Sequence, residues 1–245
     1  MKKFGWLGKF DVGSQDVDPD SEYARIFIEH KELLATKWKN YFSIYDSVFL
    51  KHSNGFVENG SERPVKFLEI GVDRGGSLQI WRKYFGPNAT IFGVDINPEC
   101  ANLDNENFQV RIGSQADKCF LQQVVKEMGG VDLVVDDGSH KAKHLRKTFD
   151  IIFPLLSEGG VYLIEDVHAS YHFMYGGGFR RSGSIVQVMK SMVDGLNKDF
   201  FKRPIARRVR LAHSEIHSIK FFESIIVIEK LTREKNFIIR SGSLK

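Results

Sequence analysis

The chain has 245 residues, of which 42% are hydrophobic and 27% are charged, and its formal net charge is +4 at pH 7. This length suits one large α/β domain, and the composition is ordinary for a globular protein. The apolar runs are too short to span a bilayer and the first residues lack the apolar stretch of a secretory signal, so we expect a cytoplasmic location and no membrane partner. The isolated cysteines, Cys100 and Cys119, do not suggest a disulfide framework or a zinc site. The small net charge does not by itself imply a nucleic-acid partner.

The first 60 residues predict a loop and a helical segment ahead of the main domain, which we place at residues 61–245. Residues 11–20 are rich in Asp, Gly and Ser and predict a loop. Residues 21–50 carry apolar side chains at roughly helical spacing, which indicates one or two amphipathic helices. The polar, glycine-containing stretch 52–64 predicts a linker.

From Val65 onward, short apolar runs alternate with helical patterns. The runs are VKFLEIG, TIFGVD, FQVRI, VDLVVD and GVYLIED. This alternation predicts right-handed parallel crossovers and a doubly wound, Rossmann-like α/β sheet. Two further runs, EIHSIKF and SIIVIEK, are joined by a tight turn and predict a C-terminal antiparallel hairpin, for about seven strands in all.

The loop after the first strand predicts a cofactor site. Gly71 allows a sharp turn, Gly75 allows close approach of a ligand to the backbone, and Ser77 is a reasonable N-cap for the next helix. The loop lacks the G-x-G-x-x-G spacing of dinucleotide sites, and Glu69 just before it would repel a pyrophosphate. S-adenosylmethionine has no phosphate and carries an ammonium and a sulfonium, so acidic surroundings favour it.

The next two strand ends extend this site. Asp95 follows the second strand and is placed to accept both ribose hydroxyls. Ser114 and Gln115 follow the third strand and could frame the adenine edge. Each has an ordinary structural alternative, with Asp95 as a turn residue and Ser114 as a helix cap. The ordered set after successive strands favours S-adenosylmethionine.

The fourth and fifth strands, which we expect to be neighbours, end in pairs of acids: Asp136 with Asp137, and Glu165 with Asp166. Four converging carboxylates repel one another, and a hard divalent cation, Mg²⁺ or Mn²⁺, would offset that repulsion. Such a cation lowers the pKa of a bound hydroxyl, and His140 could then take the proton as general base. The alternatives are that the first pair caps a helix and that His140 shares a polar helix face with the histidine four residues later.

Four segments resemble the metal-dependent sugar O-methyltransferases of macrolide biosynthesis and the wider cephalosporin hydroxylase-like methyltransferase group. These are EIGVDRGGSLQIW, GSQAD, VDDGSH and GGVYLIEDVHASY, within residues 36–178. The resemblance implies a class I methyltransferase fold, with metal ligands Asp137, Glu165 and Asp166, His140 as general base beside a catalytic Asp137, and Asp136 nearer the cofactor. It also implies that residues 171–178 lie over the acceptor.

Two segments bear on the acceptor. Tyr171 and Tyr175 precede a run of glycines and could stack on a sugar beneath a mobile lid, or belong to an ordinary surface loop. The basic residues 202–210 could hold a nucleotide-linked acceptor or form a solvated edge. We therefore expect an S-adenosylmethionine- and metal-dependent O-methyltransferase, acting as a homo-oligomer on a sugar, a nucleotide-linked sugar or another small hydroxylated metabolite.

Two alternatives remain open. A nucleic-acid methyltransferase is supported only by the basic segment, and Asp-Asp-Gly-Ser stands where base-methylating enzymes often have an Asn/Asp-Pro-Pro-aromatic motif. A non-catalytic S-adenosylmethionine-binding protein would be expected to have lost the acidic residues, which are present.

Overall fold

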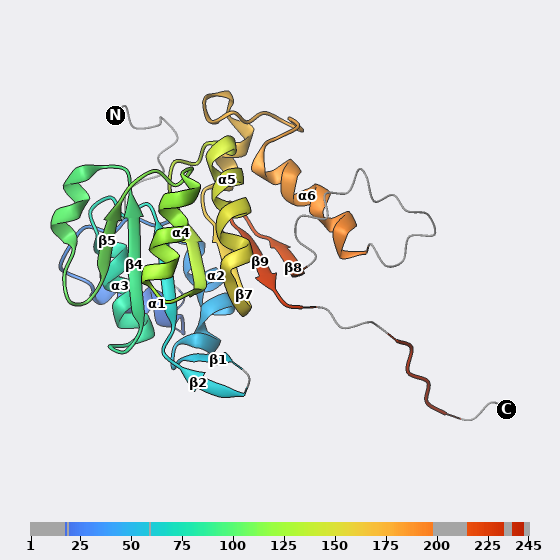
Figure 1. Ribbon diagram of the computed structural model, residues 1–245, viewed down its shortest axis with the longest axis horizontal. Coiled ribbons are helices and arrows are strands. Elements are labelled where there is room, and N and C mark those ends of the chain that lie inside the picture. The colour runs from blue at the N-terminus through green and yellow to red at the C-terminus, as the bar shows by residue number, and fades with distance from the viewer. Residues whose placement is uncertain (1–17, 19, 59, 198–214, 233–236, 243–245) are drawn as a thin grey trace.

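A seven-stranded sheet forms the centre of the computed structural model, which describes residues 18, 20–58, 60–197, 215–232 and 237–242 (Figure 1). The strands lie in the order β5-β4-β3-β6-β7-β9-β8. Their bounds are β3 (Lys66–Ile70), β4 (Thr90–Asp95), β5 (Gln109–Ile112), β6 (Val131–Asp136), β7 (Leu156–Ile164), β8 (Ile216–Phe221) and β9 (Ile226–Lys230). The first five are parallel, and β9 is antiparallel to both β7 and β8. The predicted doubly wound sheet with a C-terminal hairpin is confirmed.

Helices cover both faces of the sheet. One face packs on α1 (Glu22–Glu29), α2 (Tyr41–Phe49) and α3 (Gly76–Phe85), and the other on α4 (Lys118–Glu127), α5 (Ala142–Ile152) and α6 (Ile185–Leu196). Short 3₁₀ turns lie at η1 (Leu50–His52), η2 (Pro98–Leu103), η3 (Phe153–Leu155), η4 (Val167–Tyr171) and η5 (Phe173–Tyr175). Successive strand residues enter alternate cores: Phe67 packs in the first and Leu68 in the second. No helix among the described residues has both the length and the apolar character needed to cross a bilayer.

The predicted N-terminal helices are confirmed as α1 and α2. Their aromatic side chains join the first core, where the ring of Tyr23 lies 4.5 Å from that of Tyr45 and 4.8 Å from that of Trp81. The helices therefore share a core with the sheet. The boundary at residue 60 stays a prediction.

The stretch predicted as a linker is instead a small hairpin, β1 (Phe56–Glu58) and β2 (Ser61–Arg63). Its polar character has a structural reason. Arg63 donates two hydrogen bonds of 2.7 Å to the carboxylate of Asp132, which is fully buried at the start of β6. A buried charge needs such a partner, so the hairpin is fixed to the sheet.

The switch point of the sheet lies between β3 and β6, because the chain leaves β3 toward β4 and later returns to pair β6 on its other side. Ligands of open α/β sheets bind outside the carboxyl ends of the strands at this point. The loops after β3 and β6 touch there: a Cβ on Gly71 would lie 2.3 Å from the carbonyl oxygen of Asp137. The residues that follow these strands form the candidate site.

Candidate active site

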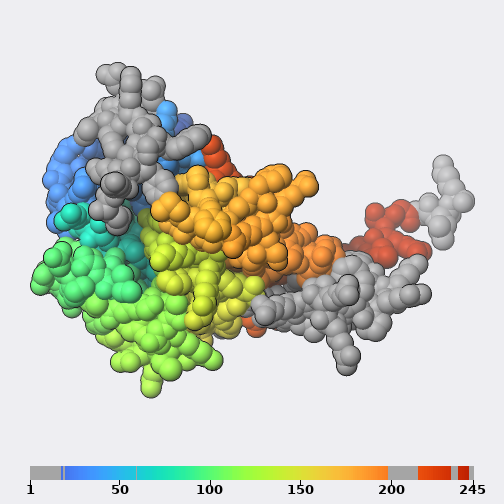
Figure 2. All heavy atoms as spheres, turned by 90° about the horizontal axis from the view of Figure 1, so that it is seen from above, coloured from blue at the N-terminus to red at the C-terminus, as the bar shows by residue number. Residues whose placement is uncertain are grey.

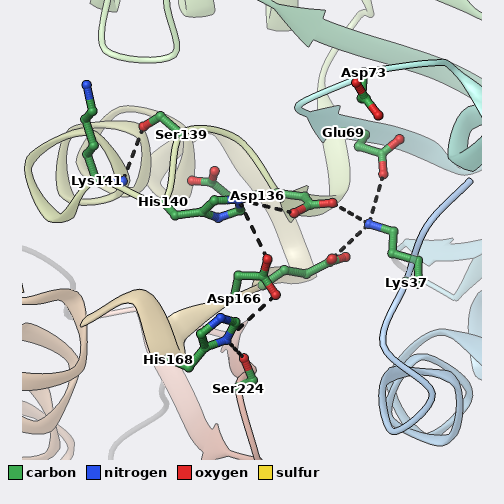
Figure 3. A network of polar contacts seen from close by, with 12 residues as sticks. Lys37, Glu69, Asp73, Asp136, Ser139, His140, Lys141, Asp166, His168 and Ser224 are labelled. Carbon is green, nitrogen blue, oxygen red and sulfur yellow. Dashed lines mark hydrogen bonds and ion pairs between the residues drawn. The ribbon is translucent and has the colours of Figure 1, made fainter. Parts of the chain in front are cut away.

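Asp137, His140 and Asp166 form a group of metal-binding type at the ends of β6 and β7. Figure 3 labels two of them, His140 and Asp166. One ligand atom of each lies within 4.8 Å of the others. His140 Nε2 is 3.9 Å from Asp137 Oδ1 and 3.7 Å from Asp166 Oδ2. Two carboxylates and an imidazole are a donor set that first-row and hard divalent cations accept. His140 Nδ1 is buried and has no hydrogen-bond partner in the described part of the chain.

The carboxylate of Glu165 points elsewhere. Its side chain is 1% exposed, with Oε1 accepting a 2.6 Å hydrogen bond from the Tyr45 hydroxyl and Oε2 a 2.8 Å bond from Lys37 Nζ. Burial, with the nearby charge of Asp137, raises the pKa of Glu165 well above its ordinary value. The predicted ligand trio is therefore divided, with two members in the metal-type group and Glu165 paired to Lys37. Its role as a ligand stays a prediction.

Asp136 lies on the opposite face, so the predicted convergence of four carboxylates is wrong for this residue. It accepts hydrogen bonds from the Tyr162 hydroxyl at 2.7 Å and from Gln115 Nε2 at 3.1 Å, and burial raises its pKa to about 6. The reason is strand alternation, which directs neighbouring side chains to opposite faces. Gln115 is committed to the same buried network, because its Oε1 also accepts from Ser139 N at 2.7 Å. Ser114 caps its own turn, accepting from Ala116 N at 3.2 Å.

The glycine loop after β3 has the predicted turns. Gly71 and Gly75 have φ of 96° and 82°, values that favour glycine. Asp95 Oδ2 accepts hydrogen bonds from the amides of Val72 at 2.8 Å and Asp73 at 3.2 Å, so it fixes this loop to the end of β4. The structure thus places Asp95 beside the loop in the role of a turn residue, with Oδ1 accepting from Asn97 N at 2.8 Å, and its part at the ribose hydroxyls stays a prediction.

Ser77 is not the N-cap, because Gly75 takes that place and α3 begins at Gly76. Its hydroxyl instead donates to the buried Glu69 carboxylate. Burial raises the pKa of Glu69 to about 7, although Lys37, whose Nζ lies 3.7 Å away, opposes this.

Tyr175 approaches the metal-type group, its ring 6.3 Å from that of His140, whereas Tyr171 is half exposed. The segment between and after them presents Phe173, Met174 and Phe179 to solvent, each about 80% exposed. Figure 2 shows this orange stretch on the surface. The basic segment 202–210 lies outside the described residues.

Three residues that the sequence did not single out complete the site. Lys37 Nζ donates to Asp137 Oδ2 at 2.6 Å as well as to Glu165. Tyr41 donates to Asp166 Oδ1 at 2.6 Å, and Tyr45 to Glu165. All three come from α2 or the segment before it. A lysine and tyrosines at helical spacing carry no signal that would connect them to acids 100 or more residues later.

The fold and this arrangement are those of class I S-adenosylmethionine-dependent methyltransferases: a switch point with a glycine loop, an acid after the second parallel strand, and acids after the fourth and fifth. A family model described as a methyltransferase domain matches residues 68–167. The chain therefore contains a methyltransferase domain over these residues, which confirms the resemblance drawn from its motifs.

Two curated relatives are named as O-methyltransferases of natural products. The chain is 36% identical over 178 residues to the 8-demethyl-8-(2-methoxy-alpha-L-rhamnosyl)-tetracenomycin-C 3'-O-methyltransferase of Streptomyces olivaceus, covering 69% of this chain and 45% of the relative. It is 29% identical over 192 residues to the mycinamicin VI 2''-O-methyltransferase of Micromonospora griseorubida, covering 74% and 48%. The chain spans about half the length of the curated relatives it matches.

A solved structure shares the fold. The MycE methyltransferase from the mycinamycin biosynthetic pathway, in complex with Mg and SAH, superposes with a TM-score of 0.72 at 28% identity, over 86% of this chain and 54% of that one.

Proposed function

We propose that the chain is an S-adenosylmethionine-dependent O-methyltransferase that uses a divalent cation, Mg²⁺ or Mn²⁺, and acts on a hydroxyl of a sugar or another small hydroxylated metabolite. The observation that carries this proposal is the group Asp137, His140 and Asp166 beside the glycine loop. A methyl donor bound at that loop would lie next to groups that can hold a cation and accept a proton. Such a location is what transfer to a hydroxyl requires.

Each part of the site has a role in this proposal. The loop from Gly71 to Gly75 offers backbone to the methionine part of the donor, and Asp95 has a carboxylate for the ribose hydroxyls. Asp137 and Asp166, together with the predicted ligand Glu165, hold the cation, which when bound lowers the pKa of a contacting hydroxyl. His140 takes the proton from that hydroxyl, and its two neighbouring carboxylates stabilise the imidazolium that results.

The acceptor class rests on the relatives and on the surface beside His140. The two curated relatives described above are named for methylating hydroxyls of glycosylated natural products. Tyr175 and the exposed aromatic stretch after it offer rings on which the face of a sugar can stack. We propose that the enzyme is cytoplasmic and works as a homo-oligomer. Its acceptor would be a sugar that is attached to a larger metabolite.

The deciding experiment separates donor binding from methyl transfer. Binding of SAH is measured by calorimetry, and radiolabelled methyl transfer is measured against rhamnosylated polyketides, nucleoside diphosphate sugars and RNA. After EDTA treatment and desalting, we expect SAH to bind with nearly unchanged affinity and methyl transfer to fall at least 100-fold. Addition of Mg²⁺ should restore the transfer.

Full transfer by metal-free protein would refute the metal role. Methylation of RNA in preference to the sugar-containing acceptors would refute the acceptor class.

A further inference from the structure

The ammonium of Lys37 lies inside the acidic part of the site (Figure 3). Its side chain is only 3% exposed, and Nζ lies 2.6 Å from Asp137 Oδ2, 2.8 Å from Glu165 Oε2 and 3.7 Å from Glu69 Oε1. The three carboxylates thus surround the buried ammonium of Lys37 in the way that carboxylates in a low-dielectric site surround a metal ion. Lys37 therefore supplies a positive charge to carboxylates that the fold alone would leave repelling one another.

Lys37 is carried by the segment between α1 and α2, residues 30–40, here called the Lys37 strap. The strap crosses the start of α3: the Leu33 amide donates to Gln79 Oε1 at 3.0 Å, and a Cβ on Gly76 would lie 2.3 Å from the Leu33 carbonyl oxygen. The strap has no helix or strand between the end of α1 and the start of α2. Lys37 is thus attached to a stretch whose position depends on few backbone hydrogen bonds.

We propose that Lys37 occupies the acidic site while the divalent cation is absent, and that the cation must displace its ammonium from Asp137 and Glu165 in order to bind. This inference rests on the metal-dependent function proposed above. Hard cations bind carboxylate oxygens at about 2.0–2.6 Å. Asp137 Oδ2 and Glu165 Oε2 are the oxygens that Lys37 uses, and two cations on the same oxygens repel each other. Lys37 consequently lowers metal affinity and couples metal binding to a movement of the Lys37 strap.

The first test measures the affinity of metal alone. Binding of Mn²⁺ is followed by electron paramagnetic resonance at pH 8 for the wild-type chain, Lys37→Met and the control Lys39→Met. The control removes the same charge from an exposed position two residues away. We expect Lys37→Met to bind Mn²⁺ at least tenfold more tightly than wild type, and Lys39→Met to stay within twofold of it. Equal or weaker binding by Lys37→Met would overturn the proposal.

The second test uses the wild-type chain and so does not depend on the variant folding. Hydrogen exchange is followed by mass spectrometry across residues 31–38 with and without Mg²⁺. Displacement of Lys37 predicts faster exchange in this stretch when Mg²⁺ is bound. Unchanged exchange at saturating Mg²⁺ means that Lys37 keeps its place, which contradicts the proposal.

Asp166→Asn separates this failure from a failure of the proposed function. If the wild-type chain binds no Mn²⁺, the metal-dependent function fails and this inference with it. If the wild type binds Mn²⁺ and Asp166→Asn does not, while Lys37→Met shows no gain, only the inference about Lys37 is wrong.

Discussion

Backbone conformation places two of the three residues of the metal-type group. His140 and Asp166 have φ of 55° and 52°, in the left-handed region that costs a non-glycine residue about 1 kcal/mol or more. Each follows a buried strand by a few residues, and each turn directs its side chain toward the other. Strained residues of this kind persist where the surrounding structure holds them, and they are concentrated at functional sites. The strain therefore supports the assignment of this group as the reacting part of the site.

His140→Asn tests whether His140 acts as a base or as a metal ligand. Asn tolerates the left-handed conformation, so the backbone should be preserved. We expect turnover to fall about 10²- to 10⁴-fold, the usual worth of a general base, with Mn²⁺ and SAH affinities within threefold of wild type. The control is His144→Ala on α5, whose imidazole pairs with the Ser139 hydroxyl at 2.9 Å. A parallel loss of Mn²⁺ affinity would show that His140 is a ligand and not the base.

The strand-end acids show how far sequence reasoning reaches. Their positions after the fourth and fifth strands followed from the sheet pattern and were correct. Their directions follow from the strand period of two, which sends the side chain of Asp136 into one core and that of Asp137 toward the site. The contacts of Lys37 could not be predicted from the sequence, because 100 residues separate it from Asp137 and 128 from Glu165. Only the packing of α1 and α2 on the sheet brings them together.

Among the elements, the loop between β3 and α3 packs closely against the loop that follows β6. Gly71 has a positive φ and lies directly against the carbonyl of Asp137, while its amide donates to Val94 O at 2.8 Å. The sequence correctly predicted a glycine turn here, but it placed the start of α3 at Ser77. Gly75 is the N-cap in a left-handed conformation, which no side-chain capping pattern reveals.

Gly71→Ala should therefore destabilise the fold and distort the donor site together. A left-handed alanine alone costs about 1–2 kcal/mol, and contact with a backbone oxygen that cannot move freely adds to it. We expect a loss of about 3 kcal/mol in the free energy of unfolding from urea titration, and at least tenfold weaker SAH binding.

The matched control is Gly60→Ala in the β1–β2 turn, where φ is 79° and nothing lies within 4 Å of the added Cβ. It should lose only the conformational part, about 1–2 kcal/mol, with SAH affinity unchanged. Equal losses in the two variants would mean that the approach of Gly71 to Asp137 is unimportant.

The cores on the two faces of the sheet enclose several titratable groups. His52 is one that takes no part in the proposed site. It lies at the end of η1, 8% exposed and stacked on Phe56 with ring centroids 5.2 Å apart. Burial, with the nearby Lys51 charge, lowers its pKa from 6.5 to about 4. The unfolded chain therefore binds a proton more readily than the folded chain between these pH values. The contribution of the neutral, buried His52 to the free energy of unfolding is therefore complete above about pH 6.5, and it is lost as the pH falls to about 4.

His52→Phe should abolish this part of the acid sensitivity. Phenylalanine keeps the stack on Phe56 and removes the buried Nε2, which has no partner among the described residues. Between pH 7.5 and 4.5 we expect wild type to lose about 2–3 kcal/mol more than the variant in the free energy of unfolding. The measurement is urea unfolding at both pH values, with the exposed His217→Gln as control. If wild type and His52→Phe lose the same amount, His52 is not buried as a neutral group.

The long sequence separations of the Lys37 contacts also have a kinetic consequence. Tyr41 meets Asp166 across 125 residues, and β9 must pair with β7 to complete the sheet beside them. Contacts between distant parts of a chain form late, because their loop-closure entropy is lost before they gain energy. Until the helices before residue 50 dock, Asp137 and Glu165 lack the ammonium of Lys37. The polar site should thus be among the last parts to assemble during refolding, and divalent ions, by screening these acids, should speed that final step.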